Sequence, residues 1–323
     1  MNALCKLLQI QYPIIQGGMG NISNAILTAA VSEAGGLGTI GAGTMKPEEV
    51  EEIIIETKRR TNKPFSVNIA ITVTPYAKQL VELVIKHEVP VVTLSAGNPG
   101  PIIPLLKEHN QKVIVVVASV KHAKKAEEAG ADVLVAEGYE AAGINSSLEI
   151  TTFTLIPQIV KNVNVPVVAA GGVGDGHGLL AALALGASGV QMGTRFIATQ
   201  EAPFHDTYKT HILQASDTDT MILGRSVGKV RRVLKNNYAA NIVKKEQEGM
   251  LPGQYDELTS EAQHILGALE GNMEAGFING GQISGLISNI PSVKELLDSM
   301  MKEASGTLQE LHTMFYALEK ERV

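Results

Sequence analysis

Short apolar runs, rich in β-branched residues, recur along the first 200 residues, and segments with charged and apolar residues at helical spacing separate them. Runs that are apolar at nearly every position are typical of strands buried on both faces, as in a parallel sheet. Eight such runs occur, at residues 14–18, 37–43, 65–70, 91–97, 113–119, 131–138, 165–172 and 189–196. Eight strands alternating with helices are the number that closes a barrel, so we predict an α/β fold, the (β/α)8 or TIM barrel.

The same alternation also allows an open, doubly wound sheet, although the count and the period favour the barrel. After the eighth run the rhythm stops. Residues 201–285 are mostly polar and compatible with helices, whereas Val293 to Arg322 is strongly helical. We therefore predict a barrel made of residues 1–200 plus 286–323, and a mainly helical lid of residues 201–285 inserted after the eighth strand.

Composition excludes several classes of protein. The 27 Lys and Arg residues against 33 Asp and Glu residues leave a formal charge of -6, which predicts no attraction to nucleic acid or to a membrane surface. The single cysteine, Cys5, leaves no disulfide framework, and the eight histidines show no metal-ligand spacing, so no metal site is predicted. His177 and His205 are weaker candidates for a functional role. No run approaches the ~20 apolar residues of a membrane helix, and no signal peptide is recognised, so a cytoplasmic protein is expected.

Glycine is over-represented, with 32 residues, and many glycines stand where the predicted strands end. In a barrel of this type the active site lies at the C-terminal ends of the strands. Glycine there lets the backbone approach a ligand closely. The segments concerned are QGGMG, GAG, SAGNPG, EG, AAGGVGDG and MGT. This distribution predicts a broad, flat ligand over the barrel mouth.

The loops after the seventh and eighth strands predict a phosphate site. AAGGVGDG leads into a helix and MGTR follows the last strand, and barrels commonly bind phosphate with these two loops and a helix N-terminus. Gly171 and Gly172 could instead serve barrel packing alone. A G-x-G-x-x-G motif at Gly36, Gly38 and Gly41 lies within a strand and opens no helix, so it is not a dinucleotide fingerprint. A phosphate-bearing cofactor held by the last two loops is predicted.

Polar side chains near the strand ends are candidates for contacts with the edge of a ligand ring. Asn68, Gln16 and Gln191 could each donate and accept through the side-chain amide, or could serve only as turn caps or satisfied polar groups of the interior. Arg195 is expected to form a structural ion pair.

The sequence resembles the FMN-dependent nitronate monooxygenase family, which also contains the flavin-dependent enoyl-acyl-carrier-protein reductases of type II. The resemblance spans nearly the whole chain, from YPIIQGGMG through EGYEAAG to GQISGLI, and AAGGVGDG followed by QMGTRF is its most specific part. It implies that FMN lies across the barrel mouth. The implied contacts are the FMN phosphate with Gly171, Gly172, Gly193 and Thr194, the isoalloxazine with Gly18 and Met19, its polar edge with Asn68, and a lid-side contact with Gln282.

One position departs from the family pattern. Many members carry a histidine shortly after the sixth strand, which acts as the acid/base, whereas EGYEAAGINSS places Ile144 there. Asn145 or Ser146 could hydrogen-bond a substrate, but neither is a general base near neutrality without an activating partner. The catalytic residue therefore stays unassigned.

This departure bears on the reaction. A nitronate is already an anion, so its oxidation needs no proton abstraction, and we predict a nitronate monooxygenase that uses O₂. The alternative is NAD(P)H-dependent reduction of an enoyl thioester, with water or Tyr139 supplying the proton. Lys229, Arg231 and Arg232 could then meet a phosphate of coenzyme A or of an acyl carrier protein, or could form a solvated lid face. A flavin-binding protein with altered chemistry is the further alternative, and a homodimer is compatible with all three.

Overall fold

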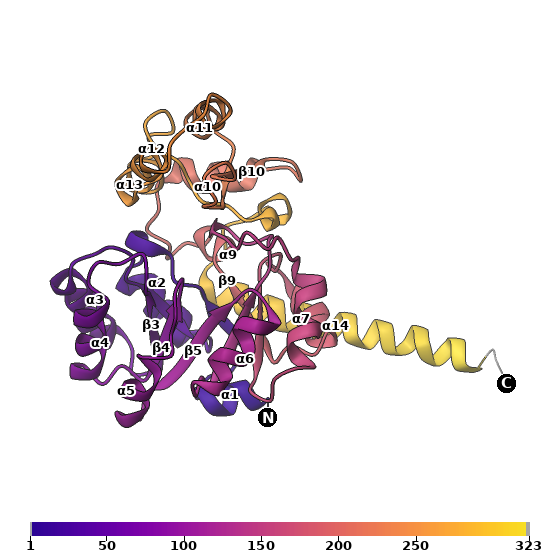
Figure 1. The fold of residues 1–323 in the computed structure, drawn as a ribbon. Helices are drawn as coiled ribbons and strands as arrows, with labels where there is room; N and C mark the ends of the chain where they lie inside the picture. Colours follow the sequence, from indigo (N-terminus) through magenta and orange to yellow (C-terminus); the bar gives the residue numbers. More distant parts are fainter. Residues whose placement is uncertain (1, 321–323) are drawn as a thin grey trace.

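The computed structural model describes residues 2–320 and contains a parallel, eight-stranded barrel (Figure 1). The strands pair in sequence order, β1 pairs with β9, and a bridge between Ile15 and Leu37 joins β1 to β2, so the barrel is nearly closed. This arrangement confirms the barrel and excludes the open sheet. The strands are β1 (Ile14–Gln16), β2 (Gly38–Gly41), β3 (Phe65–Ala70), β4 (Val91–Ser95), β5 (Lys112–Val117), β6 (Val133–Glu137), β8 (Val167–Ala170) and β9 (Gly189–Met192).

Helices surround the barrel, and local sequence signals start them. Asn24 and Ser119 accept hydrogen bonds from the first turns of α2 and α6, and Pro47 stands at the first position of α3. The short helix α1 closes the end of the barrel opposite its mouth, with Leu4 and Leu8 buried against the inner strand residues. The helices are α1 (Ala3–Leu8), α2 (Ala25–Glu33), α3 (Pro47–Arg60), α4 (Ala77–Lys86), α5 (Ile103–Glu108), α6 (Val120–Glu128), α7 (Thr152–Val160), α8 (Gly176–Ala184) and α9 (Thr194–Ile197), with a 3₁₀ turn η1 (Gly20–Ile22) after β1.

Residues 201–285, which were predicted to form a lid and are called the lid below, lie over the mouth of the barrel, on the side away from the N-terminus (Figure 1). It is mainly helical, but it also contains a small antiparallel sheet, which the polar composition did not predict. Strand β11 pairs with β10 and with β7, a two-residue strand in the loop between β6 and α7, so this sheet joins the lid to the barrel. The elements are β7 (Gly143–Ile144), α10 (Asp206–Gln214), β10 (Thr220–Leu223), β11 (Arg231–Leu234), α11 (Asn237–Gln247), α12 (Pro252–Leu258), α13 (Glu261–Ala268) and η2 (Gln282–Leu286).

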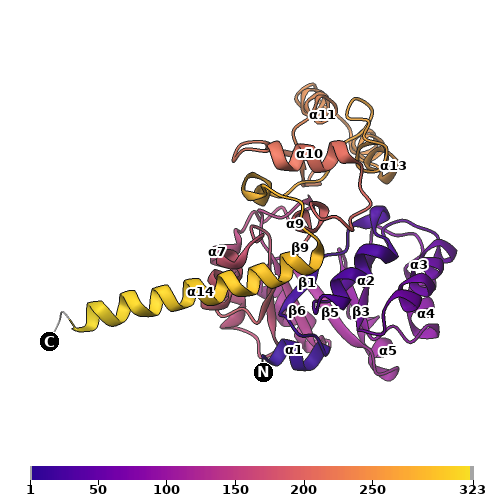
Figure 2. The ribbon, with the colours of Figure 1, turned by 180° about the vertical axis from the view of Figure 1, so that it is seen from behind.

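The last helix, α14 (Val293–Lys320), returns to the barrel and packs against α8 and α2. Its first half buries Val293, Leu297 and Met300, and Ala304 is the last of its buried apolar residues. Beyond that point the helix projects away from the barrel (Figures 1 and 2). None of the helices in the described part of the chain is long and apolar enough to cross a membrane.

Candidate active site

A cavity of about 490 Å³ lies between the mouth of the barrel and the lid. Its size falls within the range of about 300–1,000 Å³ that is usual for ligand pockets. The loops after the barrel strands form its floor and sides, and residues of the lid form the opposite wall. Seven of the eight residues that were expected to contact FMN line it: Gly18, Met19, Asn68, Gly171, Gly172, Gly193 and Thr194.

The loops after β8 and β9 form one end of the cavity. Gly171 and Gly172 have φ angles of 93° and 76°, a left-handed conformation that favours glycine. A Cβ on Gly193 would meet no atom within 4 Å, so this glycine opens onto the cavity. Thr194 begins α9, and its hydroxyl accepts a hydrogen bond of 3.0 Å from the N–H of Gly281. These residues form an open backbone cradle that fits a phosphate group.

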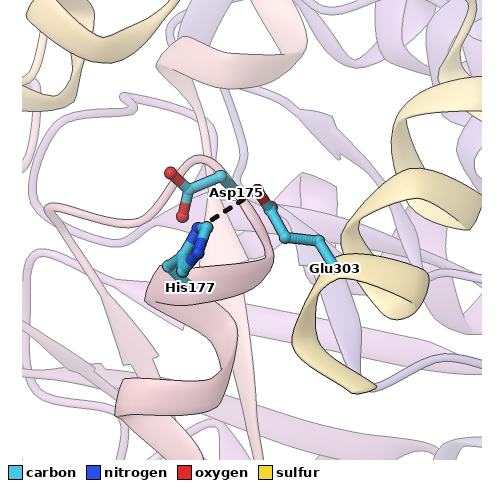
Figure 3. A group of neighbouring side chains, drawn as sticks. All are labelled: Asp175, His177 and Glu303. Atoms are coloured by element: carbon cyan, nitrogen blue, oxygen red, sulfur yellow. Dashed lines mark ion pairs between the residues drawn. The ribbon is translucent and has the colours of Figure 1, made fainter. Parts of the chain in front are cut away.

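The N-terminus of α8, in contrast, is already occupied by carboxylates. Asp175 accepts a hydrogen bond of 2.8 Å from the N–H of Gly178, and Glu303 of α14 accepts one of 2.5 Å from Gly176. His177 lies 3.1 Å from the other oxygen of Glu303 (Figure 3). The role observed for His177 is therefore to help fasten α14 to α8, and it does not line the cavity.

The loop after β1 lies against Asn68 at the other end of the cavity. A Cβ on Gly18 would lie 2.6 Å from the Cβ of Asn68, so only glycine fits there. Asn68 donates a hydrogen bond of 3.0 Å to the hydroxyl of Ser95, which holds its amide at the strand ends. Gln191 also lines the cavity, whereas Gln16 is fully buried and donates to the carbonyl of Thr39 inside the barrel.

Two other expected residues are placed differently. The side chain of Gln282 is exposed and does not line the cavity, whereas Gly281 and Ile283 on either side of it do. Arg195 is buried, but no carboxylate of the described residues lies within ion-pair distance of it. It donates instead to the backbone and side-chain oxygens of Asn289, at 3.1 and 3.0 Å. Burial lowers the pKa of Arg195 to about 10.

The histidines also differ from expectation. His205 caps α10, accepts a hydrogen bond from the N–H of Thr207 and does not line the cavity. His122, expected to be simply solvated on an outer helix, is exposed but reaches the rim of the cavity.

Ile144, where the family pattern has a histidine, lies in β7 and lines the cavity with 49% of its surface exposed. Asn145 and Ser146 line the cavity as well. The amide of Asn145 donates to the carbonyls of Tyr139 and Ala141, so it holds the loop in place. The hydroxyl of Tyr139 bonds with lid and loop side chains at the surface, and Tyr139 does not line the cavity.

The lid contributes five polar residues to the cavity wall: Tyr208, Arg231, Glu261, His264 and Asn279. The sequence analysis named only Arg231 among them, as a candidate contact for a substrate phosphate. Arg231 donates to Oδ1 of Asn279 at 3.3 Å, and Nδ2 of Asn279 lies 3.1 Å from Nε2 of His264. Nδ1 of His264 lies 3.6 Å from the carboxylate of Glu261. Burial opposes ionisation of Glu261, but His264 and Arg231 outweigh it and lower the pKa of this carboxyl. No short sequence motif connects these residues, because they come from β11, α13 and the segment before η2.

Glu137 is the carboxylate at the end of β6 and lines the same cavity. It is only partly accessible, and desolvation raises its pKa to about 7. The cavity therefore holds one carboxyl that is poised to titrate near neutrality and another, Glu261, that is held ionised.

Comparison with known proteins agrees with this fold. The family model for nitronate monooxygenase matches residues 1–77 and 69–303. The solved structure of FabK from Thermotoga maritima is 44% identical, with a TM-score of 0.93, and the match covers 97% of this chain and 99% of that one. A nitroalkane oxidase from Streptomyces ansochromogenes is 26% identical, with a TM-score of 0.82, over 95% of this chain and 99% of that one.

Among curated proteins, an octahydro-indene-carboxyl-CoA dehydrogenase from Rhodococcus jostii is 33% identical, over 96% of this chain and 97% of its own length. These relatives act on different compounds, so they show a shared scaffold rather than one substrate. The chain belongs to the nitronate monooxygenase family, whose members are flavin-dependent oxidoreductases.

Proposed function

We propose that this protein binds FMN across the barrel mouth and oxidises alkyl nitronates with O₂. Gly171, Gly172, Gly193 and Thr194 would hold the phosphate, and Gly18 and Asn68 would border the ring. The open space at Gly193 supports this fit. No protein atom lies within 4 Å of a Cβ on Gly193, so that space remains available to a ligand. Bound FMN would supply the redox chemistry, accepting electrons from the substrate and passing them to O₂.

The observation that carries the choice of substrate is the wall of the cavity beside position 144. Ile144 offers no acid or base there, and Arg231, only 7% exposed, lines the cavity next to it. Strand pairing places Arg231 directly opposite Ile144. A buried guanidinium attracts an anion and bonds well to paired oxygens. A nitronate is such an anion and needs no deprotonation, so this wall suits it.

Purified protein tests the proposal. We expect a yellow protein whose released chromophore is FMN, and O₂ consumption when propionate-3-nitronate is added. Arg231→Met should raise the KM for the nitronate about tenfold or more, because the anion loses its cationic partner. Protein that neither retains nor rebinds FMN, or that binds FMN and leaves nitronates unoxidised, would contradict the proposal.

Reduction of an enoyl thioester is the second candidate. The likeness to FabK, an enoyl-acyl-carrier-protein reductase of type II, favours it. FabK is 44% identical to this chain, more than the other relatives described above. In this reading NAD(P)H is the reductant, and a carrier protein or coenzyme A presents the substrate. Anaerobic oxidation of NADPH on addition of crotonyl-CoA, with no turnover of nitronate, would select it. The cytoplasmic location, the two-unit division at residues 201–285 and a homodimer remain predictions.

A further inference from the structure

An imidazole faces the cavity from the lid, on the opposite wall from the barrel loops. His264 lies in α13, is 3% exposed and lines the cavity. Its ring stacks on Phe277, with the two centroids 5.2 Å apart, so packing sets the plane of the ring. A histidine held rigidly in the wall of a ligand cavity is suited to proton transfer.

Glu261 orients this imidazole. Nδ1 of His264 faces Oε2 of Glu261 at 3.6 Å, and that oxygen is buried with no hydrogen bond of 3.5 Å or less from any described residue. Gly20 of the loop after β1 lies against the same carboxylate, since a Cβ on Gly20 would be 3.3 Å from Oε2. The pair therefore lies where the lid meets the barrel mouth, next to Met19.

Asn279 determines which ring nitrogen carries the proton. Arg231 donates to Oδ1 of Asn279, so the Nδ2 group of the same amide faces Nε2 of His264 and donates to it. Nε2 is then the unprotonated nitrogen, and Nδ1 carries its proton toward Glu261. The amide carbon of Asn279 would lie 3.8 Å from a Cβ on Gly143. The basic nitrogen of His264 is thus directed toward β7, the strand in which Ile144 stands.

We propose that His264, oriented by Glu261, is the acid/base of this active site and performs the proton transfer that Ile144 cannot. The inference rests on the proposed function and extends it from nitronates to neutral nitroalkanes. The nitroalkane displaces the Asn279 amide from Nε2. Its α C–H bond breaks, the proton goes to Nε2, and the electron pair forms the C=N bond of the nitronate. No electron leaves the substrate in this step.

The charged groups around His264 suit that step. Glu261 from α13 stabilises the imidazolium, and Arg231 from β11 stabilises the negative charge that develops on the nitro oxygens. Tyr208 from α10 donates its hydroxyl hydrogen to the carbonyl of Asn279 and keeps that segment in place. The nitronate then remains in the cavity as the substrate for oxidation.

The first test compares neutral nitroethane with its preformed nitronate, using the FMN-loaded enzyme. His264→Gln should lower kcat/KM for nitroethane at least 100-fold, within the range that general-base catalysis supplies, and change that for the nitronate less than threefold. His211→Gln, a lid histidine outside the cavity, is the matched control and should leave both unchanged. Exchange of the α-hydrogens of nitroethane in D₂O without O₂, followed by NMR, reports the proton transfer without turnover, and His264→Gln should abolish it.

Two further variants keep the inference testable if His264→Gln folds poorly. Glu261→Gln should shift the acid limb of the nitroethane pH profile to lower pH, because the imidazolium loses its carboxylate partner. That profile separates positioning from a purely structural role. Adding Ile144→His to His264→Gln should restore at least tenfold of the lost nitroethane activity.

Unchanged nitroethane oxidation and exchange in His264→Gln would overturn the inference and leave nitronate oxidation standing. A wild-type enzyme that oxidises nitronate but neither oxidises nitroethane nor exchanges its hydrogens would also overturn it. Enzyme that oxidises no nitronate overturns the proposed function instead. In that case, loss of α-hydrogen exchange of nitroethane in His264→Gln, with exchange kept in the wild type and in His211→Gln, would still support His264 as the base.

Discussion

At the scale of single residues, two glycines of the cavity have different reasons for being glycine. Gly171 has a φ of 93°, and a Cβ there would lie 3.0 Å from the backbone atoms Ala141 N and Gly138 O, so its conformation and its neighbours both require it. Gly193 has a φ of -110°, which any residue adopts, and faces open space. Its lack of a side chain matters only for what enters the cavity.

Gly193→Ala therefore separates ligand binding from folding. We expect the free energy of unfolding of the FMN-free protein to change by less than about 0.5 kcal/mol, because the new methyl group touches no protein atom. The methyl group would occupy the phosphate position, so the Kd for FMN should rise at least tenfold in a fluorescence titration. Gly253→Ala, in α12 and also without a neighbour within 4 Å, is the control that should bind FMN normally. Equal FMN affinity in the wild type and Gly193→Ala would place the phosphate elsewhere.

At the scale of elements, the lid is attached to the barrel through the sheet of β10, β11 and β7. Arg232 in β11 is 5% exposed and donates through Nε and Nη2 to the carbonyl of Tyr139, at 3.1 and 2.9 Å. Its third hydrogen bond reaches the hydroxyl of Thr220 in β10. The guanidinium also lies 5.0 Å from the centre of the Tyr139 ring. One side chain thus links both strands of the lid to the loop that carries Ile144.

Arg232→Met should loosen this attachment and leave the barrel intact. The Tyr139 carbonyl would lose its two guanidinium donors and keep only the amide of Asn145, and loss of a hydrogen bond to a charged group costs about 1.5–3 kcal/mol. Hydrogen–deuterium exchange should become faster at residues 139–146 and 220–234 and stay unchanged in β3 to β5. Lys229→Met, which removes an exposed pair with Asp256, serves as control and should change little. If hydrogen–deuterium exchange in Arg232→Met were the same as in the wild type at residues 139–146 and 220–234, other contacts would hold the lid.

At the scale of the whole molecule, the lid has a small core of its own and also shares the large core of the barrel. The lid packs Leu223, Ile242 and Phe277 into a small core of its own, whereas its residues Phe204, Tyr208 and Ile212 belong to the larger core, which lies mainly between the barrel strands and the outer helices. Helix α14 closes the ring of outer helices and then leaves it, with an apolar stripe exposed beyond Ala304. The stripe consists of Leu308, Leu311, Phe315 and Leu318. The cavity between the barrel mouth and the lid is lined by two carboxyl groups with shifted pKa values, Glu137 and Glu261.

Glu137 makes the stability of the FMN-free protein depend on pH. Its pKa is about 7 in the fold and 4.5 in the unfolded chain, so the folded state binds the extra proton between these values. Its contribution is therefore fully present below pH 4.5 and is lost as the pH rises through 7, up to about 3 kcal/mol at about 1.4 kcal/mol per pKa unit. Glu137→Gln should remove this loss. The difference in unfolding free energy between variant and wild type, from urea titrations, should grow from pH 5 to pH 8; a constant difference would refute the shift.

Much of the fold and part of the candidate site follow from local sequence patterns. Unalternating β-branched runs require burial on both faces, which eight parallel strands ringed by helices provide, and glycines at the strand ends locate the cavity mouth. The small sheet of the lid was missed because β10 and β11 have four residues each and pair with a two-residue strand far away in the chain. Gln282 was expected in the cavity from the family resemblance alone, but its side chain is exposed and only its neighbours Gly281 and Ile283 line the cavity.

The sequence by itself determined the barrel, the glycines that line the cavity at its mouth and the absence of a histidine at position 144. Those features depend on the spacing of residues along the chain, which folding does not change. Only the tertiary structure decided that Arg231, Glu261, His264 and Asn279 face the cavity together. They meet because the lid folds back over the barrel, where hydrogen bonds that no linear pattern records link Arg231 to Asn279 and Asn279 to His264.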